Sequence, residues 1–212
     1  MRTYSVNSIP INELHITGKV DSHLWEKAND LNGFHSPWEE IKNTETKFKA
    51  LWDGDYLFFC FEVLDSTTHV DKTDDSFNSI NKSDRVELFF RSNGSLNPYY
   101  CLEIDPTPRI MDFKAYPSRN FDFNWNWPHE DLIVKSSSNS KGFSVEGKIS
   151  IASLNKLNLI CDNKIEAGIY RAKYLKKENS VFEPIWLTWI DPETETPNFH
   201  IASSFGVLKL EM

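Results

Sequence analysis

Two glutamates in neighbouring strand-like segments are well placed to bind polar groups. In Asp84–Arg91 and Tyr99–Asp105, side chains alternate with a period of two, which is typical of β-strands that have one apolar inner face. The alternation puts Glu87 and Glu103 opposite the inner face, and the two share one sheet face if the strands pair. Such carboxylates either accept hydrogen bonds from ligand hydroxyls or pair with arginines. The candidate arginine partners are Arg85, Arg109 and Arg171.

A loop rich in aromatic residues offers a second kind of chemistry. Rings occur at every second position between residues 121 and 127, and Trp125 and Trp127 alternate with asparagines. Pyranose rings present C–H faces that pack on aromatic planes, while their hydroxyls need amide, carboxylate or guanidinium partners. Two alternatives remain open: at least one of these tryptophans contacts a ligand, or one plugs the end of the fold and the other is partly exposed. Trp186 and Trp189 fit core or near-core positions better.

The sequence carries no recognisable catalytic motif. Two carboxylates on one sheet could perform acid–base hydrolysis of glycosides, and one large class of such enzymes carries Glu-x-Asp-x-x-Glu on a strand. Glu103-Ile-Asp105 begins that pattern, but Pro108 stands where its last glutamate should be. No Gly-x-Ser-x-Gly sequence is present, and the three cysteines lack a convincing catalytic context. We therefore expect no enzymatic activity.

The signals for metal binding are weak. The six histidines show neither His-x-His nor His-Glu-x-x-His spacing, so zinc is not expected. Asp71, Asp74 and Asp75 form an oxygen-rich stretch that suits calcium, but this stretch lacks the glycine and the distal glutamate of an EF-hand loop. We expect a solvated acidic loop there, with the three aspartates as weak candidates for calcium.

The composition limits the classes of partner. The chain has 212 residues and a formal net charge of −8. Nucleic acids and anionic membranes are bound by basic faces that release counterions, so neither is an expected partner. Aromatic residues make up 14% of the chain, more than a core alone demands, and this surplus favours rings at a binding surface.

The cysteines and the apolar runs bear on the compartment. Cys60 and Cys101 lie in apolar strand-like runs, and an odd total of three implies no disulfide framework. No stretch approaches the ~20 apolar residues of a membrane span, so membrane insertion is not expected. The first ten residues do not resemble a signal peptide. The expected location is therefore the cytoplasm, or the extracellular space or periplasm if a leader has been removed.

The stretch from Lys47 to Asp65 is the strongest structural signal. Its first arm alternates, and Asp53-Gly54 strongly indicates a tight hairpin turn because both residues tolerate a positive φ. The second arm, Tyr56–Leu64, is apolar on nearly both sides. We therefore expect it to be a central strand of a sheet that is covered above and below.

Three other segments carry specific expectations. Tyr4–Ile11 is predicted to be an edge strand, because Pro10 cannot donate to a sheet ladder. Ser66–Ser83 is polar and irregular, which predicts a long surface loop. Phe143–Ile151 is predicted to be a strand, with Glu146 on its outward face.

Strands outnumber helices several-fold, with turn signals between them. This pattern predicts an all-β fold, a jelly-roll-like or Ig-like antiparallel β-sandwich with one or two short helices. The helices are expected at Ser22–Ala28 and Ser153–Leu157. Sandwiches of this size are routinely single units, so we expect one domain over residues 1–212.

Several phrases, in order, resemble the carbohydrate-binding modules of family 9 and the family 9-like domains of bacterial polysaccharide-degrading proteins. They cover nearly the whole chain, and their ordered set is more specific than any one of them. The phrases are GKVDSHLWEKA (18–28), LWDGDYLFFCFEVLD (51–65), SDRVELFF (83–90), YYCLEIDP (99–106), GFSVEGKISIASL (142–154), LTWIDP (187–192) and NFHIASSFGVLKL (198–210).

The resemblance implies a distorted jelly-roll-like sandwich, sugar binding without catalysis, and structural calcium in some members. In the family, two tryptophans can clamp a terminal sugar ring while a glutamate and an arginine bind its hydroxyls. Glu87 matches the glutamate. Asn81 stands near the position of the first tryptophan, Glu103 near that of the arginine and Phe199 near that of the second tryptophan, so three of the four residue types differ.

We therefore expect non-catalytic binding of a mono- or oligosaccharide, linked to polysaccharide degradation or uptake in a bacterium, with a glycoside hydrolase as a partner. The alternative is a structural or protein-interaction sandwich that has lost the residues that clamp the sugar. The expected ligand-binding residues are Glu87, Glu103, Arg85, Asn81, Trp125, Trp127, Phe199 and His200.

Overall fold

The computed structural model describes residues 1–42, 44–178 and 181–211. Its helical segments are the 3₁₀ turn η1 (His23–Lys27), α1 (Phe77–Asn81), η2 (Pro117–Arg119), α2 (Ile151–Lys156) and η4 (Ala202–Ser204). Its strands are β1 (Thr3–Ser8), β2 (Glu45–Trp52), β3 (Tyr56–Leu64), β4 (Arg85–Arg91), β5 (Tyr99–Ile104), β6 (Ile110–Tyr116), β7 (Asn120–Asp122), β8 (Leu132–Asn139), β9 (Gly142–Ser150), β10 (Ile160–Cys161), β11 (Lys164–Lys176), β12 (Phe182–Thr188) and β13 (Gly206–Leu210).

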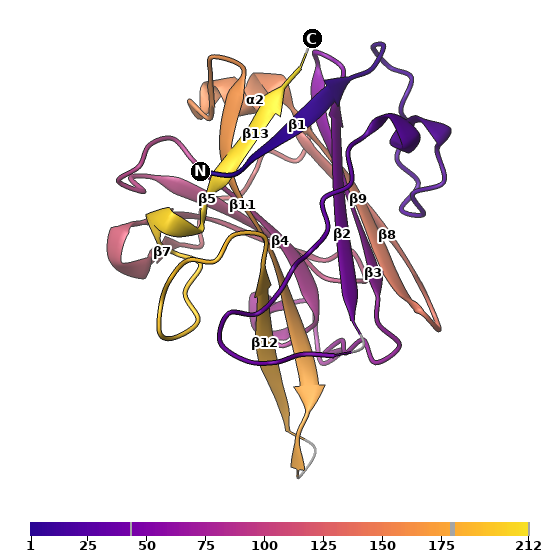
Figure 1. The fold of residues 1–212 in the computed structure, drawn as a ribbon, viewed down its shortest axis with the longest axis vertical. Coiled ribbons are helices and arrows are strands. Elements are labelled where there is room, and N and C mark those ends of the chain that lie inside the picture. Colours follow the sequence, from indigo (N-terminus) through magenta and orange to yellow (C-terminus); the bar gives the residue numbers. More distant parts are fainter. Residues whose placement is uncertain (43, 179–180, 212) are drawn as a thin grey trace.

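Two β-sheets pack face to face and are joined at β1 (Figure 1). The first sheet has the order β7-β6-β5-β4-β11-β13, and β10 and β12 also pair with β11. The second sheet has the order β2-β3-β9-β8. The prediction of an all-β sandwich is confirmed.

β1 differs from its prediction as an edge strand. It runs parallel to β13 through residues 3–6 and then parallel to β2 through Asn7 and Ser8, so it has a partner in each sheet. The prediction failed because Pro10 lies beyond the end of the strand and interrupts no ladder. These two parallel pairings also mean that the sandwich is not wholly antiparallel.

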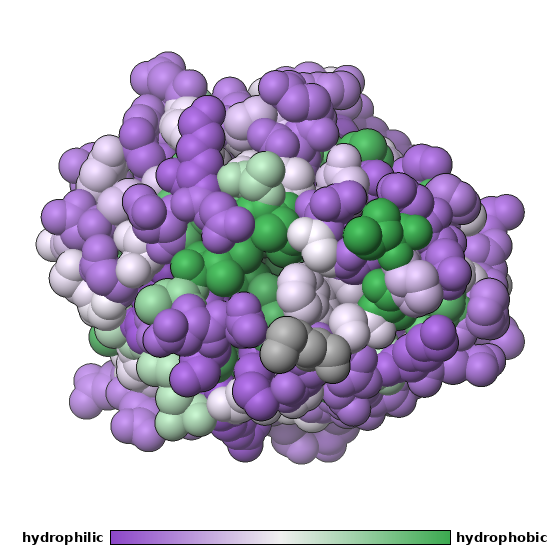
Figure 2. All heavy atoms as spheres, turned by 90° about the horizontal axis from the view of Figure 1, so that it is seen from above, coloured by the Kyte–Doolittle hydropathy of each residue, from purple (hydrophilic) through white to green (hydrophobic). Residues whose placement is uncertain are grey.

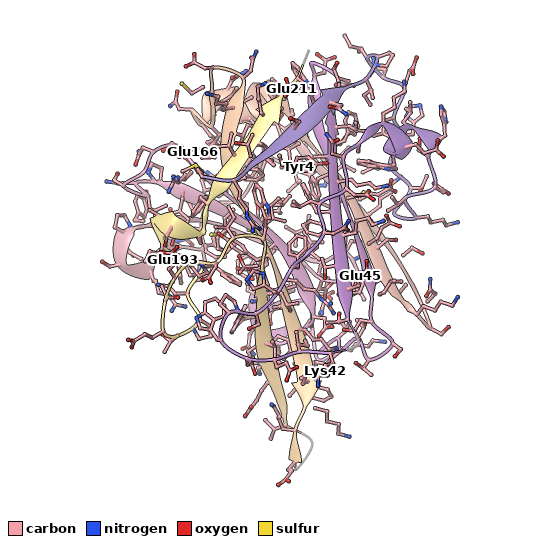
Figure 3. The ribbon with its side chains drawn as sticks, in the orientation of Figure 1. Tyr4, Lys42, Glu45, Glu166, Glu193 and Glu211 are labelled. Atoms are coloured by element: carbon pink, nitrogen blue, oxygen red, sulfur yellow. The ribbon has the colours of Figure 1, made fainter. Side chains whose placement is uncertain are left out.

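The core lies between the two sheets and is built from the alternate residues of each strand. Phe59 and Phe61 of β3 meet Leu88 and Phe90 of β4, and all four are buried. Burial of one such side chain stabilises the fold by ~1.5–3 kcal/mol. Tyr4, labelled in Figure 3, adds a polar contact inside this layer because its hydroxyl accepts a hydrogen bond from the backbone N–H of residue 50 at 3.0 Å.

The hairpin between β2 and β3 forms as predicted. The Asp53 carboxylate accepts hydrogen bonds from the backbone N–H groups of Asp55 and Tyr56, and Gly54 takes a φ of +93°. β3 lies between β2 and β9, and its outward-facing Phe58 is buried in a cluster that also contains Trp25. The expectation of a central strand covered on both faces is therefore confirmed.

The N-terminal segment covers the outer face of the second sheet, where Glu146 lies as predicted, and buries this side chain. This side chain points to the outer face but is 0% exposed. Its carboxylate accepts hydrogen bonds from the indole N–H of Trp25 (2.7 Å) and from the backbone N–H groups of Thr17 (2.8 Å) and Gly18 (2.5 Å). The strand pattern alone could not reveal this cover, because the covering residues lie more than 100 positions away.

One end of the sandwich has a mostly hydrophilic surface. Figure 2 shows the end of the molecule that is uppermost in Figure 1, where polar residues surround a limited apolar area. Within the described ranges, no helix is long and apolar enough to cross a membrane.

The Glu146 contacts predict a large stability effect. Glu146→Ala leaves the Trp25 indole and the Gly18 amide as buried donors without their acceptor. Each such donor costs ~1–3 kcal/mol, so we expect the free energy of unfolding to fall by roughly 3 kcal/mol in urea titrations followed by tryptophan fluorescence. Glu183→Ala, at an exposed position of β12, is the control and should stay within ~0.5 kcal/mol of wild type. Equal stability of the two variants would contradict the role assigned to Glu146.

Candidate functional site

The outer face of the first sheet carries a pocket of about 430 Å³. This volume lies within the ~300–1,000 Å³ range of small-molecule sites. The floor consists of Arg85 and Glu87 from β4 and Glu103 from β5. The walls are contributed by α1 (Phe77, Asn78, Asn81), by β6 and β7 with the residues beside them (Met111, Phe113, Arg119, Phe121, Phe123), and by β12 with the segment before η4 (Trp186, Pro197, Asn198, Phe199, His200).

The two glutamates of the floor face each other across neighbouring strands. Glu87 and Glu103 are direct partners in the antiparallel ladder of β4 and β5. Side chains directly opposite in such a ladder lie on the same face, about 5 Å apart at Cβ. The prediction that these glutamates share one sheet face is confirmed.

Arg85 bridges both glutamates inside the protein. Its Nε lies 2.5 Å from Glu103 Oε2 and 3.0 Å from Glu87 Oε1. The guanidinium also donates from Nη1 to the backbone carbonyl of Asn81, and it lies 5.3 Å from the ring centre of Trp186. Arg85 therefore ties the floor of the pocket to α1 on one side and to β12 on the other.

The shared arginine leaves one carboxylate oxygen without a hydrogen bond. The Nε–H of Arg85 is directed at Glu103, so Glu87 Oε1 accepts none from it despite the short distance. Among the described residues, this oxygen has no hydrogen-bond partner, although Glu87 is 1% exposed. A buried carboxylate oxygen without a partner is costly, and a ligand donor in the pocket would satisfy it.

The floor holds a proton at neutral pH. Burial and the neighbouring charge of Glu103 raise the pKa of Glu87 to about 8, although the nearby Arg85 favours its ionised form. Burial also raises the pKa of Glu103, which Arg85 opposes. Glu87 is therefore protonated at pH 7, and Arg85 is the positive charge that faces the pair.

Aromatic rings form the walls on both sides of this floor. Phe199 stacks on Tyr170 with ring centres 4.0 Å apart, and the ring of Trp186 stands edge-on to Phe199 at 5.7 Å. On the facing side, Phe77 and Phe123 lie 5.9 Å apart, and Phe123 is 47% exposed. The walls therefore present apolar surface toward the cavity.

His200 lines the pocket as a neutral ring. Its Nδ1 lies 3.0 Å from the hydroxyl of Tyr99, and its ring stacks on Phe89 at 5.2 Å. Burial, together with the positive charges of Arg119 and Arg85, lowers the pKa of His200 to about 3. At neutral pH this ring can exchange hydrogen bonds without adding charge.

The four positions that the family resemblance singled out all lie at this pocket. Asn81, Glu87, Glu103 and Phe199 each line it. Glu103 lies where the resemblance places an arginine, and Arg85, on the neighbouring strand, supplies a guanidinium to the same floor. The predicted site residues Arg85 and His200 belong to the pocket as well.

Trp125 and Trp127 do not line this pocket, and their burial matches the alternative in which one plugs the end of the fold and the other is partly exposed. Trp127 is only 4% exposed, and its indole N–H donates to the Ser153 hydroxyl. The Asp112 carboxylate accepts a hydrogen bond from the backbone N–H of Trp127 and turns the loop over the end of the core. Trp125 packs beside it, with its ring centre 4.8 Å from that of Tyr100.

Ten residues that line the pocket were not among the predicted site residues, and Trp186, Phe77 and Asn78 show why. Trp186 was placed in or near the core, yet it lines the cavity from β12. Phe77 and Asn78 belong to α1, a helix within the stretch predicted as a surface loop. The available signal was the Ser76 cap, whose hydroxyl accepts a hydrogen bond from the N–H of Ser79, but a helix of five residues is too short to show an apolar period.

The calcium candidates Asp71, Asp74 and Asp75 lie around an arginine. The guanidinium of Arg109 lies among them, donating to the backbone carbonyls of Asp71 and Asp74 and lying 3.6 Å from the Asp75 carboxylate. The Asp105 carboxylate holds this arginine at 2.6 Å. A guanidinium therefore takes up oxygens that a cation would need. Within the described ranges, no group of three or more His, Cys, Asp and Glu side chains is placed to hold a metal ion.

Comparison with solved structures shows the same fold elsewhere. A candidate carbohydrate-binding protein from Bacteroides uniformis superposes with a TM-score of 0.74 at 15% identity, covering 99% of both chains. A carbohydrate-binding module of family 9 from Caldicellulosiruptor kristjanssonii, in complex with cellotriose, gives a TM-score of 0.66 at 18% identity over 99% of this chain and 94% of that one. The glucose complex of a family 9 module from the same organism gives 0.64 at 18% identity, over 99% and 96%.

Sequence comparison identifies the family. No curated protein matches the chain. The family model described as "Carbohydrate family 9 binding domain-like" matches residues 16–212, which is nearly the whole sequence. The chain belongs to the family of carbohydrate family 9 binding domain-like proteins.

Proposed function

We propose that the pocket binds a mono- or oligosaccharide without converting it. The observation that carries this proposal is the buried, unpartnered Oε1 of Glu87 on the floor of a cavity with aromatic walls. Membership of the family supports it, as do the structural relatives that hold cellotriose and glucose.

The chemistry of the pocket matches that of a sugar ring. The apolar C–H faces of a pyranose pack against aromatic rings such as Trp186 and Phe123. Its hydroxyls act both as donors and as acceptors, so they suit a floor that contains a protonated carboxyl, a second carboxyl group and a guanidinium. A hydroxyl donor at Glu87 Oε1 would supply the missing hydrogen bond.

The arrangement of the acids supports binding rather than hydrolysis. Glycosidases place two carboxyl groups on opposite sides of the bond that they cleave. Here Glu87 and Glu103 share one nitrogen of Arg85 and lie together in the floor. We further propose that the domain serves polysaccharide degradation or uptake beside a glycoside hydrolase, a role that suits a binding domain of this family.

Substitutions at the pocket should weaken saccharide binding. Glu87→Ala removes a floor carboxyl and Trp186→Ala removes a wall, so we expect each to lower affinity at least ~10-fold in calorimetric titrations with the tightest ligand of a mono- and oligosaccharide panel. Trp125→Ala, outside the pocket, is the matched control and should bind as wild type does. Circular dichroism checks that each variant is folded.

Two outcomes would overturn this proposal. If a broad saccharide panel shows no saturable binding to the wild type, the alternative of an interaction sandwich without sugar binding is favoured. If Trp125→Ala loses binding while Glu87→Ala and Trp186→Ala keep it, the site lies on the tryptophan loop instead.

The protonated floor predicts a pH-dependent stability that depends on Glu87. Its pKa rises from an ordinary 4.5 to about 8 on folding, so between these values the unfolded chain binds fewer protons and the wild type loses stability as pH rises. Glu87→Gln cannot ionise at this position. We expect urea unfolding at pH 5, 6.5 and 8 to show that, as pH rises, the free energy of unfolding of the variant increases relative to that of the wild type by a few kcal/mol. Asp84, whose pKa burial raises to about 6, contributes to both proteins and cancels in the difference. A difference that stays constant with pH would contradict a shared proton.

A further inference from the structure

Arg119 is a cation that has no partner among the described residues and lines the pocket. It ends η2, where Ser118 and Arg119 take φ values of +64° and +58°. Residues other than glycine rarely adopt this left-handed backbone conformation. Here it turns the chain between β6 and β7 beside the cavity. Arg119 is exposed and lines the pocket, and it makes no hydrogen bond or ion pair with any residue of the described ranges.

The other charged groups that line the pocket already have partners. Arg85 lies between both glutamates of the floor, and His200 is neutral at pH 7. The charge of Arg119 is therefore left over, although the chain as a whole has a net charge of −8. A positive charge at the edge of the cavity favours ligands of negative charge, even though the protein as a whole is acidic.

The positive field of Arg119 reaches the interior of the pocket. It contributes, after burial, to the lowered pKa of His200, and it also acts on the hydroxyl of Tyr99 beside that ring. His200 lines the pocket beside Phe199, and the Tyr99 hydroxyl lies 3.0 Å from its Nδ1. A substituent on a sugar packed against Phe199 would lie within the influence of the guanidinium.

We propose that the pocket selects saccharides that carry an anionic substituent, a carboxylate or a sulfate ester, which pairs with Arg119. A planar guanidinium matches either group through two parallel N–H···O hydrogen bonds. This inference rests on the proposed saccharide binding, and it names the class of sugar and the residue that sets it.

The test compares charged and neutral sugars of the same ring type by calorimetry at low salt. Glucuronate, galacturonate and glucose 6-sulfate are the charged ligands, and glucose, galactose and the methyl ester of glucuronate are their neutral counterparts. We expect wild type to prefer the charged member about 10-fold. This ratio should fall to near one in Arg119→Gln, be partly kept in Arg119→Lys and shrink in 0.5 M salt. Lys156→Gln, an exposed lysine of α2 away from the pocket, makes the same charge change and should keep the wild-type ratio.

Each outcome decides the matter. A preference for carboxylates or for sulfates alone supports the inference and identifies the group. A ratio near one in wild type, or a preference that survives Arg119→Gln, overturns the inference. In that case, binding of neutral sugars that is lost in Glu87→Ala would still support the proposed function. Absence of binding to every sugar overturns both.

Discussion

The buried bridge from Arg85 to Glu87 and Glu103 is the interaction on which the site depends. Two carboxylates and one guanidinium on neighbouring strands are expensive to remove from water, and such groups can often be replaced by apolar residues without loss of stability. Here the bridge also holds α1 through the carbonyl of Asn81 and lies against Trp186. Since the Nε–H of Arg85 points at Glu103, Glu87 Oε1 has no hydrogen bond among the described residues, and Glu87 keeps its proton at pH 7. Buried polar groups that lower the stability of the fold are typical of a binding site.

The different covers of the two sheets explain why the pocket lies where it does. The outer face of the second sheet is closed by the N-terminal segment, which Glu146 fastens through Trp25 and the backbone of residues 17 and 18. The outer face of the first sheet is covered only in part, by α1 and by the segment that contains Phe199. A rigid two-layer core supports both faces. The incomplete cover of the first sheet leaves a pocket above the polar floor that small molecules can enter. Sites that loops build on a stable scaffold are common.

The sequence predicts the features that depend on strand period and turn chemistry. The sandwich, the Asp53-Gly54 hairpin and the common face of Glu87 and Glu103 all follow from alternation and from the conformations that these residues allow. Features set by distant parts of the chain do not follow. The spacing of Trp125 and Trp127 suggests exposed rings, but the carboxylate of Asp112 on β6 draws the backbone of Trp127 inward. The same holds for the N-terminal segment that covers Glu146, for the five-residue helix α1 and for the pocket wall beside β12. Each depends on tertiary contacts, and no local sequence pattern indicates it.

The central claim is that a saccharide binds over this floor, and a crystal structure of the complex tests it most directly. The protein would be crystallised with the tightest ligand of a saccharide panel. The account predicts a sugar in the pocket with a hydroxyl oxygen about 2.6–3.2 Å from Glu87 Oε1 and a C–H face against the aromatic wall. A sugar seated elsewhere, for example over Trp125, with Glu87 Oε1 still without a ligand partner, would contradict the account.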